Sequence, residues 1–145
     1  MRNSYIIRSL LLASIFLSCD PWFQYSPYEA DVDSTYLETN AKNLALIQAK
    51  NSQDSKPFKV ALLADPHYHY GRLDEAIDHI NQNPEYAFAI VAGDLTENGL
   101  LQEYIYFHDA MSRLKVPYLA VIGNHDYLAN GEMVYQQIYG PVNST

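Results

Sequence analysis

The chain has 145 residues, of which 48% are hydrophobic, so it can form one domain or part of one and is too apolar for a disordered protein. It carries 9 basic and 17 acidic residues, a formal net charge of −8, and the basic residues form no cluster. Because binding to a nucleic-acid backbone needs clustered Lys and Arg, we find no nucleic-acid-binding signature.

The first 18 residues have the pattern of a bacterial signal peptide. Arg2 and Arg8 flank the start of an apolar run at residues 9–18, which is too short to cross a bilayer as a helix. The tail Leu17-Ser18-Cys19 resembles a lipobox that ends at Cys19, the residue that would be lipidated. We therefore expect an exported lipoprotein of the cell envelope, held to the membrane by lipid on Cys19 with its domain outside the cytoplasm. A signal peptide that is cleaved without lipidation is the alternative.

Residues 19–57 are predicted to form a tether and a short helix. Residues 20–33 have two prolines and no periodicity, which is typical of a tether. Thr35 and Glu38 have the spacing of a capping box, so we expect a helix to begin there and to end near Asn51. Its apolar face would contain Leu37, Ala41, Leu44 and either Ile47 or Gln48. Polar residues 51–57 would link it to the next domain.

From residue 58 the chain alternates strand and helix patterns. Apolar runs at 58–64, 87–92 and 117–122 predict strands, and the run at 58–64 predicts a strand covered on both faces. Segments 73–80, 100–114 and 132–138 have helical periodicity. The order predicts an α/β fold with a parallel sheet and right-handed crossovers. We expect His79 and His108 on the surface of the helices, and His69 exposed or at the rim of the site.

Each predicted strand ends in polar side chains. The three motifs are Asp65-Pro66-His67, Gly93-Asp94 and Gly123-Asn124-His125-Asp126. Because the carboxyl ends of parallel strands meet at one edge of the sheet, these side chains are predicted to face one site.

The residue types indicate a metal centre. Carboxylate, imidazole and amide oxygen suit manganese, zinc or iron. Two such ions about 3.5–4 Å apart stabilise both the attacking and the leaving oxygen of a phosphoryl displacement, and they lower the pKa of bound water so that hydroxide is available. No protein nucleophile is then needed.

In order and spacing, the three motifs resemble those of the calcineurin-like metallophosphoesterases, which run D-x-H, G-D and G-N-H-D/E. The resemblance covers about residues 58–140. It implies that residues 58–145 form the N-terminal part of a four-layer α/β/β/α sandwich. It also implies hydrolysis of phosphate mono- or diesters by hydroxide that two divalent ions activate.

The resemblance also implies a role for each site residue. Asp65 and His67 would hold the first metal, Asp94 would bridge both metals, and Asn124 would hold the second. His125 would contact the phosphate and assist the leaving group, and Asp126 would orient the His125 imidazole.

The sequence departs from the family in one respect. The family supplies further histidines from a downstream H motif and a G-H-x-H motif, and this sequence has no histidine after Asp126. We therefore expect this 145-residue form to be an inactive fragment, with only one of the two sheets and an uncovered apolar sheet surface. One alternative is a non-catalytic envelope lipoprotein or binding module with an incomplete metal site. Another is an adapter-like pseudoenzyme, against which the intact D-x-H motif argues. The oligomeric state is not predicted.

Overall fold

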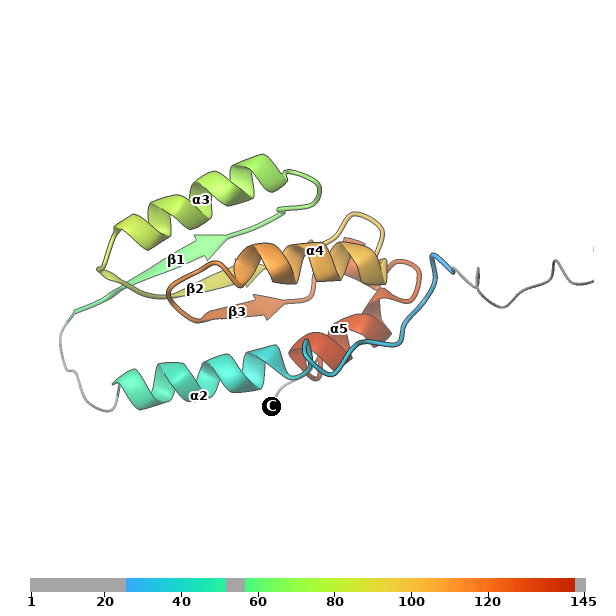
Figure 1. Ribbon diagram of the computed structural model, residues 1–145, viewed down its shortest axis with the longest axis horizontal. Helices are drawn as coiled ribbons and strands as arrows, with labels where there is room; N and C mark the ends of the chain where they lie inside the picture. The colour runs from blue at the N-terminus through green and yellow to red at the C-terminus, as the bar shows by residue number, and fades with distance from the viewer. Residues whose placement is uncertain (1–25, 52–56, 143–145) are drawn as a thin grey trace, which may run out of the picture.

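The computed structural model describes residues 26–51 and 57–142, so the predicted signal peptide, Cys19 and most of the 51–57 linker lie outside the described residues. Figure 1 shows strands and helices in alternation, which confirms the predicted α/β class. Among the described residues, no helix has both the length and the apolar character needed to cross a membrane. The elements in chain order are α2 (Thr39–Asn51), β1 (Lys59–Leu63), α3 (Tyr70–Gln82), β2 (Tyr86–Ala92), α4 (Leu101–Met111), β3 (Tyr118–Val121), the 3-10 helix η2 (His125–Tyr127) and α5 (Gly131–Tyr139).

The three strands form one parallel sheet in the order β1-β2-β3. Leu62 pairs with Ile90 and Ile90 pairs with Leu119, so the strands are in step along the sheet. All three strands therefore end at the same edge, as the motif spacing predicts.

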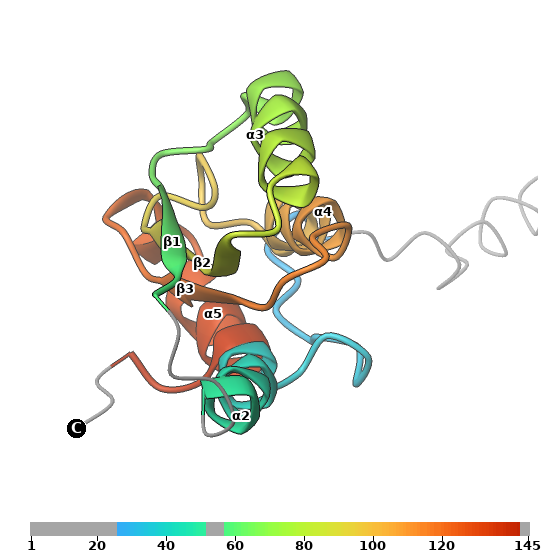
Figure 2. The same cartoon turned by 90° about the vertical axis from the view of Figure 1, so that its left-hand side faces the viewer.

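One face of the sheet carries the core. Ala89, Val91 and Ala120 point into it and are at most 2% exposed. Figure 2 shows α3 and α4 on this side of the sheet, and Ile77 of α3 and Phe107 of α4 contribute to the same buried cluster. Small residues on the strands let the helices approach closely, and the large side chains of the helices fill the layer.

The opposite face of the sheet has no covering layer in the described part of the chain. Leu62 is 71% exposed, Val121 is 51% exposed and Val60 is 39% exposed. The prediction that residues 58–64 form a strand covered on both faces is therefore wrong for these residues. The continuous apolar run predicts burial of both faces, and here only the side that holds Ala61 is buried. The uncovered apolar surface expected from the resemblance is present.

Helix α2 begins later than the capping-box pattern predicts. Its first residue is Thr39, and Glu38 has a left-handed backbone with φ of 59°. The N–H of Glu38 donates to the carbonyl of Gln137 in α5 at 3.1 Å. This tertiary contact takes Glu38 out of the helix, so the box with Thr35 does not form.

The inward face of α2 combines polar contacts to the sheet with the buried side chain of Ile47. The Asn40 amide both donates to the Ala120 carbonyl (2.8 Å) and accepts from the Ala120 N–H (2.9 Å), and Asn43 donates to the carbonyl of Tyr118 (2.8 Å). The predicted face is correct at Ile47, but Ala41 and Leu44 are exposed. The two asparagines cover the outer edge of β3, which has no strand partner in the described chain.

Part of the predicted tether is docked on α5. The side chain of Asn130 donates to the carbonyl of Tyr28 (2.6 Å), and that of Gln137 donates to the carbonyl of Ala30 (2.7 Å). The N–H of Val32 donates back to Gln137 Oε1 at 3.4 Å. Figure 1 shows this segment in blue running beside α5 before the chain enters α2. The absence of periodicity predicted a tether, and it gives no sign of this docking.

His108 is largely buried between α2 and α4, so its prediction as a surface residue is wrong. Its Nε2 lies 3.2 Å from Oγ1 of Thr39, and its ring meets the edge of Tyr36 with centroids 5.0 Å apart. Burial lowers the pKa of His108 and outweighs the opposing effect of Asp109.

Candidate metal centre

The loops after β2 and β3 approach each other through two glycines. Gly93 has a φ of 86°, and a Cβ there would lie 2.9 Å from the Cα of Gly123. A Cβ on Gly123 would lie 2.2 Å from the backbone nitrogen of Asp94. A side chain at either position would push the loops apart, so the glycines of both motifs are needed to bring Asp94 beside His125.

The loops after β1 and β2 are held together by their main chains. Asp65, His67 and Asp94 have left-handed backbones with φ of 51°, 39° and 51°. The N–H of Asp65 donates to the carbonyl of Gly93, and that of His67 donates to the carbonyl of Asp94, each at 3.3 Å. Each such residue costs about 1–3 kcal/mol, and strain of this kind is concentrated at functional sites.

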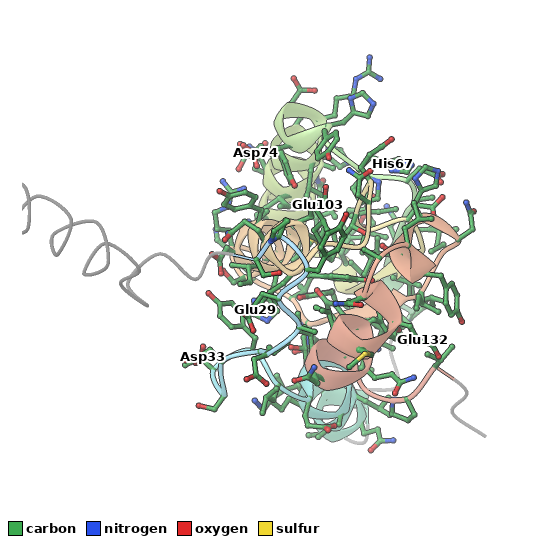
Figure 3. The ribbon with its side chains drawn as sticks, turned by 90° about the vertical axis from the view of Figure 1, so that its right-hand side faces the viewer. Glu29, Asp33, His67, Asp74, Glu103 and Glu132 are labelled. Carbon is green, nitrogen blue, oxygen red and sulfur yellow. The ribbon has the colours of Figure 1, made fainter. Side chains whose placement is uncertain are left out.

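Three of the predicted site residues come together. His67, Asp94 and His125 each place one potential ligand atom within 4.8 Å of the other two. The Nε2 of His67 lies 3.9 Å from Oδ2 of Asp94, and the two imidazole rings are edge to face with centroids 4.7 Å apart. Figure 3 looks onto the end of the molecule where the strands end, and His67 lies there.

Two other predicted metal ligands are placed differently. Asp65 is exposed and lines a cavity of about 250 Å³ together with His69 and Arg72, and it is not one of the three clustered residues. Asn124 is exposed at the start of η2. His69 is exposed, as expected.

Asp126 is fully buried and binds main chain rather than the His125 ring. Its Oδ1 accepts from the N–H and hydroxyl of Thr96 at 2.9 and 2.7 Å. Its Oδ2 accepts from the N–H of Leu95 at 3.1 Å and from that of Gly123 at 2.9 Å. The orienting contact expected between Asp126 and the imidazole is therefore replaced by contacts that join the loops after β2 and β3.

Glu97 makes the contact that was expected of Asp126. Its carbonyl oxygen lies 2.8 Å from Nδ1 of His125, and its carboxylate Oε2 lies 3.1 Å from Nδ1 of His67. The hydrogen bond to the Glu97 carbonyl raises the pKa of His125, and the Asp94 carboxylate adds to this effect. Nothing in the local pattern identifies Glu97, because its role depends on where the loop places it.

A second carboxylate missed from the sequence, Glu103 of α4, fixes the Glu97 loop. Glu103 is 6% exposed and accepts from the hydroxyl of Tyr68 at 2.6 Å and from the N–H of Asn98 at 2.9 Å. Burial raises its pKa, but these hydrogen bonds outweigh that effect and hold the pKa below its usual range. The same contact raises the pKa of Tyr68 to about 12. The sequence signal for Glu103 is its place three residues after Leu100, the residue that precedes α4. A Glu at that position often caps the start of a helix.

The geometry agrees with a comparison against known families. Residues 58–144 match the family model described as calcineurin-like phosphoesterase. The chain belongs to this family. Its three motifs lie at the ends of β1, β2 and β3, so family membership and the metal-binding character of the His67, Asp94 and His125 cluster support each other.

Two relatives have names that specify a substrate. The chain is 33% identical over 91 residues to a probable cyclic nucleotide phosphodiesterase of Xenorhabdus bovienii, an alignment that covers 63% of this chain and 35% of the relative. It is 35% identical over 66 residues to a probable glycerophosphodiester phosphodiesterase of Arcobacter nitrofigilis, covering 45% of this chain and 24% of the relative. The chain thus spans only about a third or less of these curated relatives. No solved structure matches it significantly.

Proposed function

We propose that the complete protein hydrolyses phosphodiesters in a reaction that depends on two divalent ions of manganese, zinc or iron. The observation that supports this most directly is the convergence of His67, Asp94 and His125 at adjacent strand ends of a calcineurin-like phosphoesterase. A diester substrate is favoured over a monoester because both relatives described above are named as phosphodiesterases.

The residues present fit divalent ions of this type. Imidazole nitrogen and carboxylate oxygen are the donors that such ions prefer, and the three clustered side chains are only partly exposed. When bound, the ions would supply a water of lowered pKa and would polarise the phosphoryl oxygens.

In the proposed two-ion form the side chains have distinct tasks. Asp65 and His67 would hold the first ion, Asp94 would be a ligand of both ions, and Asn124 would hold the second. His125 lies on the third loop, where its imidazole can bind a phosphate oxygen or give a proton to the leaving oxygen. The Glu97 carbonyl holds Nδ1 of that imidazole, which leaves Nε2 for the substrate.

We also propose that the protein acts outside the cytoplasm, at a membrane to which lipid on Cys19 attaches it. The support is the basic start, the apolar run at residues 9–18 and the lipobox-like Leu17-Ser18-Cys19. Incorporation of labelled palmitate that is lost in Cys19→Ala would support lipidation, and equal labelling of both forms would contradict it.

The activity test uses the complete protein with bis(p-nitrophenyl) phosphate and added manganese. We expect turnover that exhaustive chelation abolishes, and we expect His67→Ala and Asn124→Ala to abolish it as well. Cyclic nucleotides and glycerophosphodiesters, assayed in parallel, distinguish between the two substrate classes. Turnover that survives chelation would refute the metal-dependent reaction.

The 145-residue chain is assayed beside the complete protein, and we expect it to show no turnover. The reason is that the family's downstream histidine motifs are absent from its sequence. If the complete protein also shows no turnover, the alternative of a non-catalytic binding module is favoured.

A further inference from the structure

We propose that Tyr68 determines substrate specificity, with its fixed ring stacking against a planar base that the phosphodiester carries. The substrates it selects are nucleotide diesters rather than glycerophosphodiesters. This inference deepens the proposed function and rests on it for the phosphodiester substrate. It concerns a residue that holds no metal, so Tyr68 is assigned to substrate binding and not to the chemical step.

The side chain of Tyr68 joins the loops after β1 and β2. Its backbone follows directly on His67, and its hydroxyl oxygen lies 2.6 Å from the side-chain nitrogen of Asn98. Asn98 is next to Glu97 in the chain, and Oε2 of Glu97 lies 3.1 Å from Nδ1 of His67. Both ends of the Tyr68 side chain are therefore attached close to His67, which puts the ring at the rim of the metal centre.

A triangle of hydrogen bonds fixes the end of the Tyr68 ring. Its hydroxyl donates to Oε1 of Glu103 at 2.6 Å and accepts from the amide of Asn98 at 2.6 Å. The same amide donates to Oε1 of Glu103 at 3.0 Å. Glu103 is 6% exposed and its Oε2 accepts from the N–H of Asn98, so the anchor is itself held in place. Figure 3 labels His67 and Glu103, the residues beside the two ends of the Tyr68 side chain.

The ring of Tyr68 is exposed although its hydroxyl is fixed. Tyr68 is 53% exposed, whereas Tyr104 and Tyr139 in the core are at most 2% exposed. An exposed ring adds little buried apolar area to the fold, so the contacts of the hydroxyl serve to present the ring. A rigid aromatic side chain loses little conformational entropy when a ligand binds, and every nucleobase has a face that can stack on it.

The charge beside the ring favours a neutral base over a second acidic group. The carboxylates of Glu97 and Glu103 lie on either side of the Asn98 contact, and they repel an anion. A glycerol group has no flat surface to place on the ring. A nucleobase has one, and stacking of a base on an aromatic side chain typically strengthens binding about fivefold or more.

The test measures binding of adenosine monophosphate and of glycerol phosphate to the complete protein with manganese, by calorimetry. The two ligands share a phosphate monoester, and only the nucleotide has a base. We expect Tyr68→Leu to weaken binding of the nucleotide at least about fivefold and to leave the Kd of glycerol phosphate within about twofold. Tyr68→Phe loses the same hydroxyl contacts and keeps the ring, so it should bind the nucleotide more tightly than Tyr68→Leu does.

Tyr106→Leu is the matched control for loss of an exposed tyrosine. Tyr106 is 55% exposed on α4 and lines the groove between α3 and α4 with Tyr70, away from the Asn98 contact. This substitution should leave the Kd of both ligands within about twofold, as is usual for a surface change. Circular dichroism checks that each variant is folded.

Four results would overturn the proposal. The original protein might fail to bind the nucleotide, or folded Tyr68→Leu might bind it with unchanged affinity. Tyr68→Leu might weaken both ligands equally, which would indicate a disturbed metal centre. Tyr68→Phe and Tyr68→Leu might weaken the nucleotide equally, which would assign the effect to the hydroxyl contacts. Because binding is measured without turnover, the platform and the phosphodiesterase activity can fail separately.

Discussion

At the scale of single residues, a buried carboxylate that contacts main chain can matter as much as one that contacts a metal. Asp126 has no exposed surface and accepts hydrogen bonds from Leu95, Thr96 and Gly123. The hydroxyl of Tyr104 donates to the Asp126 carbonyl at 3.0 Å, which also fixes the start of η2. Asp126 thus positions Asp94 and His125 through the backbones of their loops.

We expect Asp126→Asn to destabilise the fold by about 3 kcal/mol, since hydrogen bonds to a charged acceptor are strong and an amide presents N–H groups to buried donors. Urea unfolding followed by circular dichroism measures this change. Asp78→Asn, at an exposed carboxylate on α3, is the control and should change stability by less than about 0.5 kcal/mol. Equal effects of the two substitutions would contradict a structural role for Asp126.

At the scale of elements, α2 is attached to the sheet by polar contacts that depend on geometry. Asn40 and Asn43 replace a neighbouring strand at the edge of β3, and Thr39 contacts His108 of α4. Helix α2 lies outside the residues that match the family. It therefore adds its own protection to a β3 edge that would otherwise be unpaired in the described chain.

The partly buried His108 makes this attachment sensitive to pH. Its pKa in the folded chain is lower than its ordinary value of 6.5, so below pH 6.5 the unfolded chain binds a proton that the folded chain does not. The free energy of unfolding should therefore fall as the pH is lowered from about 6.5, and this effect should end below the folded pKa.

Urea unfolding between pH 7 and pH 5 tests the effect, and we expect a smaller loss of stability in His108→Gln than in the original chain. His79→Gln, at an exposed histidine on α3, should behave like the original chain. Parallel pH profiles for all three proteins would show that His108 does not cause the loss.

At the scale of the whole molecule, the described chain has a core on one side of its sheet and an apolar surface on the other. Leu62, Val60 and Val121 lie on that surface, and Phe58, which precedes β1, is 52% exposed. Contiguous exposed apolar surface favours association. The described chain therefore has a packed core on one face of its sheet and, on the other face, an apolar surface that favours self-association.

We expect Leu62→Lys to reduce self-association of the 145-residue chain while changing its stability by less than about 0.5 kcal/mol, because Leu62 is 71% exposed. Light scattering over a concentration series measures the change. Leu46→Lys adds the same charge on α2, away from the sheet, and should have a smaller effect. Equal effects would mean that charge alone, and not the sheet surface, controls association.

The sequence was sufficient for features that depend on local pattern. Apolar runs predict all three strands, and the strand-end motifs correctly predict that His67, Asp94 and His125 meet. The roles of Glu97 and Glu103 could not be predicted, because they arise from loops brought together by the fold. The inward face of α2 was missed for a similar reason, since Asn40 binds a main chain 80 positions away in the sequence.

The docking of residues 28–32 on α5 has a mechanical consequence. Tension applied from the N-terminal side would reach the bond from Asn130 to Tyr28 first, then the bond from Gln137 to Ala30, and the Val32 contact last. Bonds loaded one after another peel at low force. This segment would therefore yield before α2 or the sheet, and the strand-end residues would keep their arrangement under load.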